Sequence, residues 1–523
     1  MPIVSRRGRI WPALPLIALG IAGCTESHTP PASGDPAGTS LVIAVADEPT
    51  SLNPLAGYAE NGAAKIFDGL VEHRANASLR PALAAELPTP ASDGKSWVAT
   101  LRRGVTFSDG TPFDAADVVA TYRALLDPAF ASPMRQRFAM LSGVEQIDPM
   151  TVRFELSRPY APFPQLLVLG ILPSEALAQP APAAGGAPPI GTGPYKLADW
   201  QRGQRMVLEA NKSYYDGAPA ITRVTVEFVS DDDARAQRMR DGRVDCAALP
   251  PALAKTFEDA NGLKVVAHSA ADLHTVLLPA ANPVTADPAI RLALNYGVNR
   301  KALVDGLLGG KGSEASTPMP EMLAEFVEPT AHFSYDVTRA LDLLSEAGWQ
   351  PGADGLRAKG GVTAAFTLLY RGGDTVARDL AAAFAASAKG IGIQVTPEAA
   401  DRTVLLTRAG QDAVLLGVGN PFDPDLRLFD LLHSGVSPSG YANATVDAAL
   451  ETGRTSTDPA QRATAYRKLQ RAYVSAPGMV ELVAPQHSYV IRENWNGYEP
   501  VVDGESADAT WGAWWNLGKW APR

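Results

Sequence analysis

The stretch Leu101–Tyr122, LRRGVTFSDGTPFDAADVVATY, constrains the fold more than any other part of the sequence. Val105 and Phe107 alternate with more polar neighbours, a pattern that predicts a half-buried strand. Ser-Asp-Gly follows at once, and Gly110 permits the positive φ that a tight turn requires. The first half of the stretch therefore predicts a strand that runs into a turn.

The second half of the stretch carries the signals of a helix. Asp114 lies where an N-cap belongs, and Asp117 follows three residues later as the acidic partner of a capping box. Apolar residues then recur at helical spacing until Asp127-Pro128, which cannot continue a helix. A capped helix should therefore begin just after Asp114 and end near Asp127.

Length and composition bound the kind of protein. A chain of 523 residues is too long for one hydrophobic core, so two or three domains are expected. Hydrophobic content of 46% with 20% charged residues is typical of a soluble globular protein. A formal net charge of −10 argues against nucleic acid or an anionic membrane surface as a partner.

The N-terminus reads as a secretory signal. Basic residues at 6, 7 and 9 precede a short apolar run, Trp11–Ile21, that is well below the roughly 20 residues needed to span a bilayer. The run ends Ile-Ala-Gly-Cys24, which resembles the bacterial lipobox, whose cysteine becomes a lipidated mature N-terminus. A coincidental cysteine is the alternative. Residues 1–23 are thus predicted to be a lipoprotein signal peptide, Cys24 the lipid anchor, and the Pro/Ser/Gly/Thr-rich residues 24–40 a disordered tether.

Three motifs in order make the chain resemble a known family. SDGTPF is followed by GTGPY at Gly191–Tyr195 and by EAGW at Glu346–Trp349. In combination they resemble bacterial extracellular solute-binding protein family 5, the lipid-anchored or periplasmic proteins that feed peptide and nickel ABC importers. The resemblance covers about residues 41 to 500.

The resemblance implies an α/β fold of the two-lobe periplasmic-binding-protein type (type II, large cluster) with an extra subdomain. It predicts lobe I at residues 41–276, with the inserted subdomain at about 71–189, and lobe II at 277–493. Residues 494–523 are expected to return to lobe I, and the apolar run His274–Pro279 is interpreted as the first crossing between lobes. In such proteins the lobes close over a ligand and exclude water.

The segment Gly417–His433, GVGNPFDPDLRLFDLLH, is expected to carry the ligand-binding chemistry. Peptide-binding relatives usually place an aspartate here to pair with the α-ammonium of the ligand, and the matching position is Asn420. An amide can accept a hydrogen bond from an ammonium but brings no charge. Phe422 and Asp423 are further candidate ligand contacts, although Asp423 could simply shape the turn.

Two other candidate contacts come from lobe I. Tyr58, in the first loop expected to face the ligand, is a candidate aromatic platform or else a packed tyrosine. The Asn-Pro-Phe-Asp-Pro form of the cleft segment looks like nickel-chelate binders, in which an arginine after a glutamine holds carboxylates of the chelator. Arg137 occupies that place, with Arg135 as a competitor, but Leu169–Pro173 lacks the arginine of that subfamily.

Catalytic and metal-binding signatures do not occur in the sequence. It has no GxSxG elbow, and its seven histidines form no HxH or HExxH spacing. His433 lies near the cleft segment, where a structural role is the alternative to a ligand role. We therefore expect no enzyme activity, no cofactor and no structural metal.

These observations together predict a substrate-binding lipoprotein of an ABC importer. Its expected ligand is a short peptide or peptide-like amino compound held between the lobes, and its expected partner is the permease in the cytoplasmic membrane. A nickel or other metal chelate, or an orphan role as sensor or chaperone, are the alternatives. The protein is predicted to be monomeric, extracytoplasmic and anchored to the membrane through Cys24, with no nucleic-acid partner.

Overall fold

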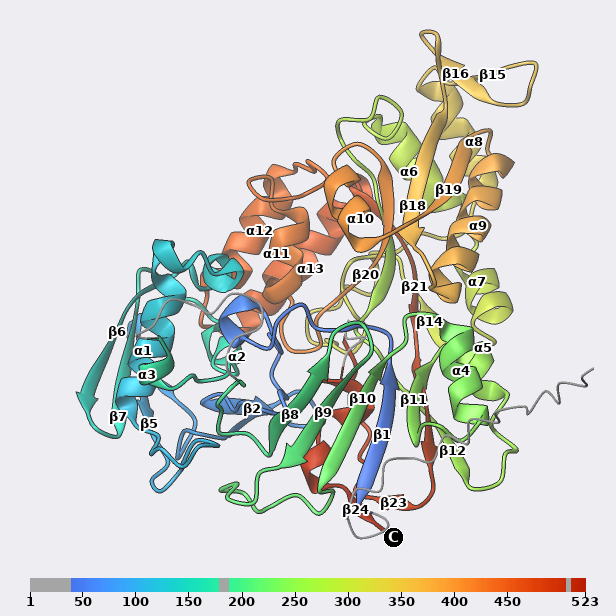
Figure 1. Cartoon of the computed structure of the whole chain (residues 1–523). Helices are drawn as coiled ribbons and strands as arrows, with labels where there is room; N and C mark the ends of the chain where they lie inside the picture. Colours follow the sequence, from blue (N-terminus) through green and yellow to red (C-terminus); the bar gives the residue numbers. More distant parts are fainter. Residues whose placement is uncertain (1–38, 178–187, 505–508) are drawn as a thin grey trace, which may run out of the picture. The chain divides into compact units, whose positions relative to one another are not determined.

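The computed structural model describes residues 39–177, 188–504 and 509–523. The predicted signal peptide, Cys24 and nearly all of the predicted tether lie outside these residues. Two sheets organise the described chain: a seven-stranded sheet in lobe I and a six-stranded sheet in lobe II (Figure 1). Among the described residues, no helix is both long and apolar enough to cross a bilayer.

The lobe I sheet is built around β1, whose apolar run LVIAV is largely buried. This strand pairs in parallel with β10 on one side and β11 on the other, while the outer strands pair antiparallel. A strand covered on both faces reads as a continuous apolar run, which explains the sequence of β1. In spatial order the strands are β12 (Leu263–His268), β22 (His487–Arg492), β11 (Cys246–Leu249), β1 (Ser40–Val45), β10 (Arg223–Phe228), β9 (Arg205–Ala210) and β8 (Tyr195–Gln201).

A subdomain is inserted between β1 and β8. Its four-stranded sheet has the order β4 (Thr89–Pro90), β5 (Ser96–Thr100), β7 (Thr151–Leu156) and β6 (Leu141–Asp148). Helix α1 (Ala115–Leu126) contacts β6 and β7, and it is followed by short helices η2 (Pro128–Phe130), η3 (Pro133–Phe138), α2 (Phe163–Leu166) and α3 (Ser174–Leu177). Helix η1 (Pro54–Ala56) and the hairpin of β2 (Val71–His73) and β3 (Leu79–Pro81) lead into it.

Lobe II contains the second sheet, in the order β14 (Gly312–Glu314), β21 (Met479–Pro485), β13 (Leu273–Leu277), β20 (Ala413–Val418), β18 (Ala365–Arg371) and β19 (Gln394–Ala400). A small sheet of β15 (Gln350–Pro351), β16 (Arg357–Lys359) and β17 (Val362–Thr363) projects from it. The helices of this lobe are α6 (Pro288–Gly297), α7 (Arg300–Leu307), α8 (Val337–Glu346), α9 (Thr375–Gly390), α10 (Arg402–Arg408), α11 (Asp425–Leu432), α12 (Ala444–Thr455) and α13 (Pro459–Ser475). Lobe I contributes α4 (Asp232–Arg240) and α5 (Pro251–Lys255).

The chain changes sheets twice, and both changes differ from the sequence interpretation. The strand β12 of lobe I ends at His268 and β13 of lobe II begins at Leu273, so the first crossing is Ser269–Asp272. The run His274–Pro279 was expected to be this crossing, but its first four residues belong to β13, an interior strand of lobe II. The second crossing is Gln486, between β21 and β22, rather than the expected 493/494 boundary.

In the stretch Leu101–Tyr122, the predicted turn at Gly110 and the predicted helix are confirmed, whereas the predicted strand is not. Asp114 caps α1 by accepting from the backbone N–H of Ala116, and Asp117 completes the capping box. The expected strand at 105–107 is wrong, because the turn at Gly110 (φ +94°) folds the segment back so tightly that a single bridge forms. Both apolar residues of this segment are nevertheless buried.

The C-terminal segment packs in the core of lobe I. Trp514 meets Tyr489 of β22 edge-on, with ring centroids 5.5 Å apart, and Trp520 meets Tyr498 in the same way. Strands β23 (Trp495–Asn496) and β24 (Ala521–Pro522) pair with each other, and helices η4 (Gly512–Trp514) and η5 (Leu517–Lys519) lie between them in the sequence.

Candidate functional site between the lobes

The cleft segment Gly417–His433 leaves β20 at Gly419, a glycine that the packing requires. A Cβ atom at Gly419 would lie 1.8 Å from the carbonyl oxygen of Ala271, in the first crossing. No side chain fits at that distance, so the cleft segment and the crossing pack backbone to backbone. This contact fixes the position of Gly419 against the first crossing.

Asn420 closes its own turn. Its Oδ1 accepts hydrogen bonds from the backbone N–H groups of Phe422 (2.8 Å) and Asp423 (3.2 Å), and its side chain is buried. Its Nδ2 donates to Oδ1 of Asn61 in lobe I at 3.5 Å. The amide thus shapes the turn and reaches across to the other lobe.

Phe422 packs across the two lobes. Its ring stacks on His73 of lobe I with centroids 3.4 Å apart and planes 7° from parallel, and it meets Trp511 edge-on at 5.1 Å. Burial lowers the pKa of His73 to about 4, more than its hydrogen bonds to Gln165 and the Asn61 carbonyl raise it. A neutral imidazole therefore faces the phenylalanine, and Phe422 is a packing residue of the interlobe contact.

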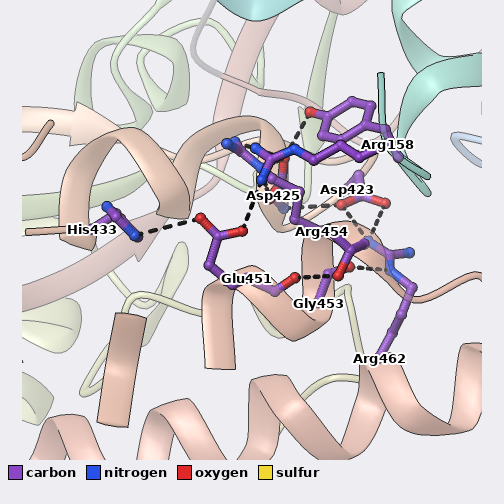
Figure 2. Close-up of polar contacts among 10 residues, drawn as sticks. Arg158, Asp423, Asp425, His433, Glu451, Gly453, Arg454 and Arg462 are labelled. Carbon is purple, nitrogen blue, oxygen red and sulfur yellow. Dashed lines mark hydrogen bonds and ion pairs between the residues drawn. The ribbon is translucent and has the colours of Figure 1, made fainter. Parts of the chain in front are cut away.

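Asp423 is buried and paired within lobe II. Nη2 of Arg462, on α13, lies 2.8 Å from each of its carboxylate oxygens, and the backbone N–H of Asp425 donates to it at 2.9 Å (Figure 2). Desolvation raises the pKa of Asp423 to about 6 even though Arg462 opposes the shift. The carboxylate is therefore already committed to a structural ion pair.

Asp425, the first residue of α11, joins the lobes. Arg454 of α12 binds both of its oxygens, at 3.0 and 3.1 Å (Figure 2). The hydroxyl of Tyr160, in the subdomain, donates to its Oδ2 at 2.7 Å, and the backbone N–H of Ala161 donates to the Arg454 carbonyl at 3.0 Å. These two interlobe hydrogen bonds hold lobe II against the subdomain.

A pocket of about 230 Å³ lies beside these contacts, with one wall from the subdomain and the other from lobe II. Its lining is Gln136, Arg137, Ala139, Met140, Arg158, Tyr160, Asp425, Leu426, Phe429, Asp430, His433, Gly435, Val436 and Arg454. Because both lobes contribute, opening the lobes would also open this pocket.

Ion pairs involve all three arginines of the pocket. Arg137 pairs with Glu60 of lobe I at 2.9 Å. Arg158 pairs across the lobes with Glu451 at 3.2 Å, and Arg454 holds Asp425. Figure 2 shows Glu451 between Arg158 and His433.

Polar contacts also join the lobes at a second place, where the end of β1 and the start of α4 in lobe I meet β18 and α9 of lobe II. Arg371 of β18 makes an ion pair with Asp47, which follows β1. Asp232, at the start of α4, accepts from the backbone N–H and the hydroxyl of Thr375, at 3.0 and 2.8 Å. Thr375 is the first residue of α9, whose N-terminal N–H groups favour a carboxylate.

A buried polar cluster lies at the hinge, by which we mean the two crossings between the lobes, Ser269–Asp272 and Gln486. Asp503 accepts from Tyr489 at 2.6 Å and lies 3.1 Å from His268, at the end of β12. His487 lies beside Asp272, 3.4 Å away, and beside Asp503, 3.5 Å away. Burial alone would lower the pKa of His487, but these two carboxylates raise it to about 10. The first crossing therefore supplies Asp272 to this cluster, and His487, the first residue after the second crossing, supplies the imidazole.

Of the residues singled out in the sequence, only Arg137 and His433 line the pocket. Tyr58 is 6% exposed and belongs to the core of lobe I. Asn420, Phe422 and Asp423 make the contacts described above. The ligand roles expected for these three residues, for Tyr58 and for Arg137 stay predictions. Sequence reasoning missed Tyr160, whose partner is distant in the chain, and Asp430, which has no motif around it.

The comparisons with known proteins agree with this architecture. Residues 78–438 match the profile of the bacterial extracellular solute-binding proteins, family 5. The chain belongs to this family. The resemblance and the two-lobe fold inferred from the sequence are therefore confirmed.

The relatives of this family 5 member differ in what they bind. It is 41% identical over 501 residues to Protein XP55 of Streptomyces lividans, covering 94% of this chain and 92% of the relative. NikZ of Campylobacter jejuni, solved with Ni(L-His), superposes with a TM-score of 0.85 at 25% identity over 92% of this chain and 99% of its own. AppA of Bacillus subtilis, solved with a nonapeptide, gives 0.82 at 25% identity, with the same coverage.

Membership supports several coarse statements. Family 5 proteins bind solutes for ABC importers outside the cytoplasm, and the family is not one of enzymes. In the part of the chain that the structure describes, no three His, Cys, Asp or Glu side chains gather in a way that could hold a metal ion.

Proposed function

We propose that this protein is the substrate-binding lipoprotein of an ABC importer. It captures short peptides or peptide-like amino compounds between its lobes and delivers them to a membrane permease. It acts as a monomer, anchored outside the cytoplasmic membrane through a lipid on Cys24.

The observation that carries this proposal is the pocket whose two walls come from different lobes. Tyr160 and Arg158 reach from the subdomain to Asp425 and Glu451 of lobe II, so the contacts that close the pocket break when the lobes part. A binding protein needs such a closed form, because the permease must distinguish loaded from empty protein. AppA, with its nonapeptide, supports the peptide assignment.

A metal chelate is the second candidate. NikZ with Ni(L-His) supports it, and so does Arg137 at the pocket wall. The ion pair between Arg137 and Glu60 weighs against it, because the arginine is already neutralised. An orphan sensor or chaperone lipoprotein would use the same pocket without a permease.

Native mass spectrometry of residues 41–523, purified without refolding, tests the choice of ligand. Co-purified masses that differ by amino-acid residues support the peptide assignment. A single mass with the isotope pattern of nickel contradicts it and favours the chelate. Cys24→Ala in the full-length chain tests the anchor, because the protein should then leave the membrane fraction.

A further inference from the structure

Asp430 is the one charged side chain of the pocket that has no ionic partner among the described residues. The three arginines are paired with Glu60, Glu451 and Asp425, as described above. Asp430 makes no hydrogen bond or ion pair with any described residue. Among the described residues, the pocket and its immediate partners therefore have a single unpaired charge, and this charge is negative.

The position of Asp430 directs this charge into the pocket. It lies on α11, whose residues Asp425, Leu426 and Phe429 also line the pocket, as does the C-cap residue His433. Spacings of three and four residues place all of these on one face of the helix. The side chain is exposed to the pocket, and desolvation by the walls raises its pKa despite the positive charges of Arg454 and Arg137.

The remaining walls suit a small ligand with an apolar part. Met140 and Phe429 supply apolar surface, and Tyr160 closes one side. A volume of about 230 Å³ is below the roughly 300–1,000 Å³ of common ligand pockets, which favours a ligand of amino-acid to dipeptide size. A long peptide would need the lobes to stand further apart.

We propose that Asp430 is the anchor for the ammonium group of a small, amine-bearing ligand. The inference rests on the proposed function and deepens it, because it assigns the amine recognition that Asn420 does not provide. The ammonium supplies the ionic partner that Asp430 lacks, and the apolar part of the ligand lies against Phe429. An ammonium–carboxylate hydrogen bond is among the stronger polar contacts.

The test is calorimetric titration of residues 41–523 with glycyl-phenylalanine and with N-acetyl-glycyl-phenylalanine, which has no ammonium. The wild type should bind the free amine at least about ten-fold more tightly. Asp430→Asn should reduce the ratio to near one, while Asp430→Glu, which keeps the charge, should preserve most of it. Asp342→Asn is the matched control, since Asp342 is an exposed carboxylate on α8, outside the pocket.

The outcomes separate the inference from the proposed function. If the wild type binds the dipeptide but Asp430→Asn keeps the same ratio, the inference is wrong and the peptide function stands. Equal binding of both probes by the wild type has the same meaning. Binding of neither probe, together with a co-purified metal chelate, overturns both.

Discussion

The hydrogen bond from Tyr160 to Asp425 should control how far the lobes stay closed. It joins the subdomain to lobe II at 2.7 Å, and Tyr160 is 3% exposed. Tyr160→Phe removes the hydroxyl and keeps the ring. Asp425 on α11 and Arg454 on α12 both belong to lobe II, so their contacts do not depend on closure and the substitution should affect the closed form alone.

The expected size follows from the charge of the acceptor. A hydrogen bond to a charged group contributes about 1.5–3 kcal/mol. Because about 1.4 kcal/mol is a factor of ten, Tyr160→Phe should shift the equilibrium between closed and open forms roughly 10- to 150-fold toward open. The melting temperature should change little, because the cores of both lobes are untouched.

Single-molecule energy transfer can measure this equilibrium. Dyes on cysteines introduced at the exposed positions Ala129 and Ala448 report on the subdomain and α12. The native Cys246 is buried, and burial raises its pKa well above the usual range, so it should react slowly. Tyr335→Phe, at a tyrosine that is 53% exposed, is the control. Unchanged populations in Tyr160→Phe would refute the reasoning.

Three further predictions concern stability. Arg462→Met should lower the free energy of unfolding by about 3–5 kcal/mol at pH 8, since it leaves the buried Asp423 carboxylate unpaired; urea titrations should show a smaller deficit at pH 5, below the pKa of about 6. Gly419→Ala should cost at least about 1–3 kcal/mol in thermal unfolding, whereas Gly410→Ala, where a Cβ meets nothing within 4 Å, should be tolerated. Protonated His487, whose pKa is raised to about 10, stabilises the fold fully below about pH 6.5. This contribution is lost as the pH rises through about 10. The gap in melting temperature between wild type and His487→Gln should therefore narrow from pH 7 to 10.5, and a constant gap would contradict the assignment.

Local signals allowed part of the fold to be predicted. The capping of α1 by Asp114 and Asp117 depends on neighbours three residues apart, and the sequence shows those directly. The strand prediction at 105–107 was wrong because alternating apolar residues indicate only which side chains are buried. A buried tight loop can show the same alternation as a strand. The assignment of His274–Pro279 to the crossing was wrong because an interior strand and a crossing segment can both be extended and apolar, and the sequence does not distinguish them.

The site was harder to predict because its contacts are long-range. Asp423 was rightly given a turn-shaping alternative, but its partner Arg462 is on another helix, and no local pattern connects the two. Asn420 shapes its turn through hydrogen bonds that the sequence did not predict, and its expected contact with a ligand stays a prediction. Asp430 becomes a candidate only when the ion pairs of its neighbours are known.

The partly exposed ion pairs between the lobes and the buried ion pairs at the hinge should respond differently to dissolved salt. Arg371–Asp47 and Arg158–Glu451 join the lobes through side chains that are 34–46% exposed, so mobile ions can screen them. The hinge cluster is shielded, with Asp503 1% and Asp272 10% exposed. High ionic strength should therefore weaken the exposed ion pairs that hold the lobes closed, and with them the binding of a ligand. The buried cluster at the crossings should keep its geometry.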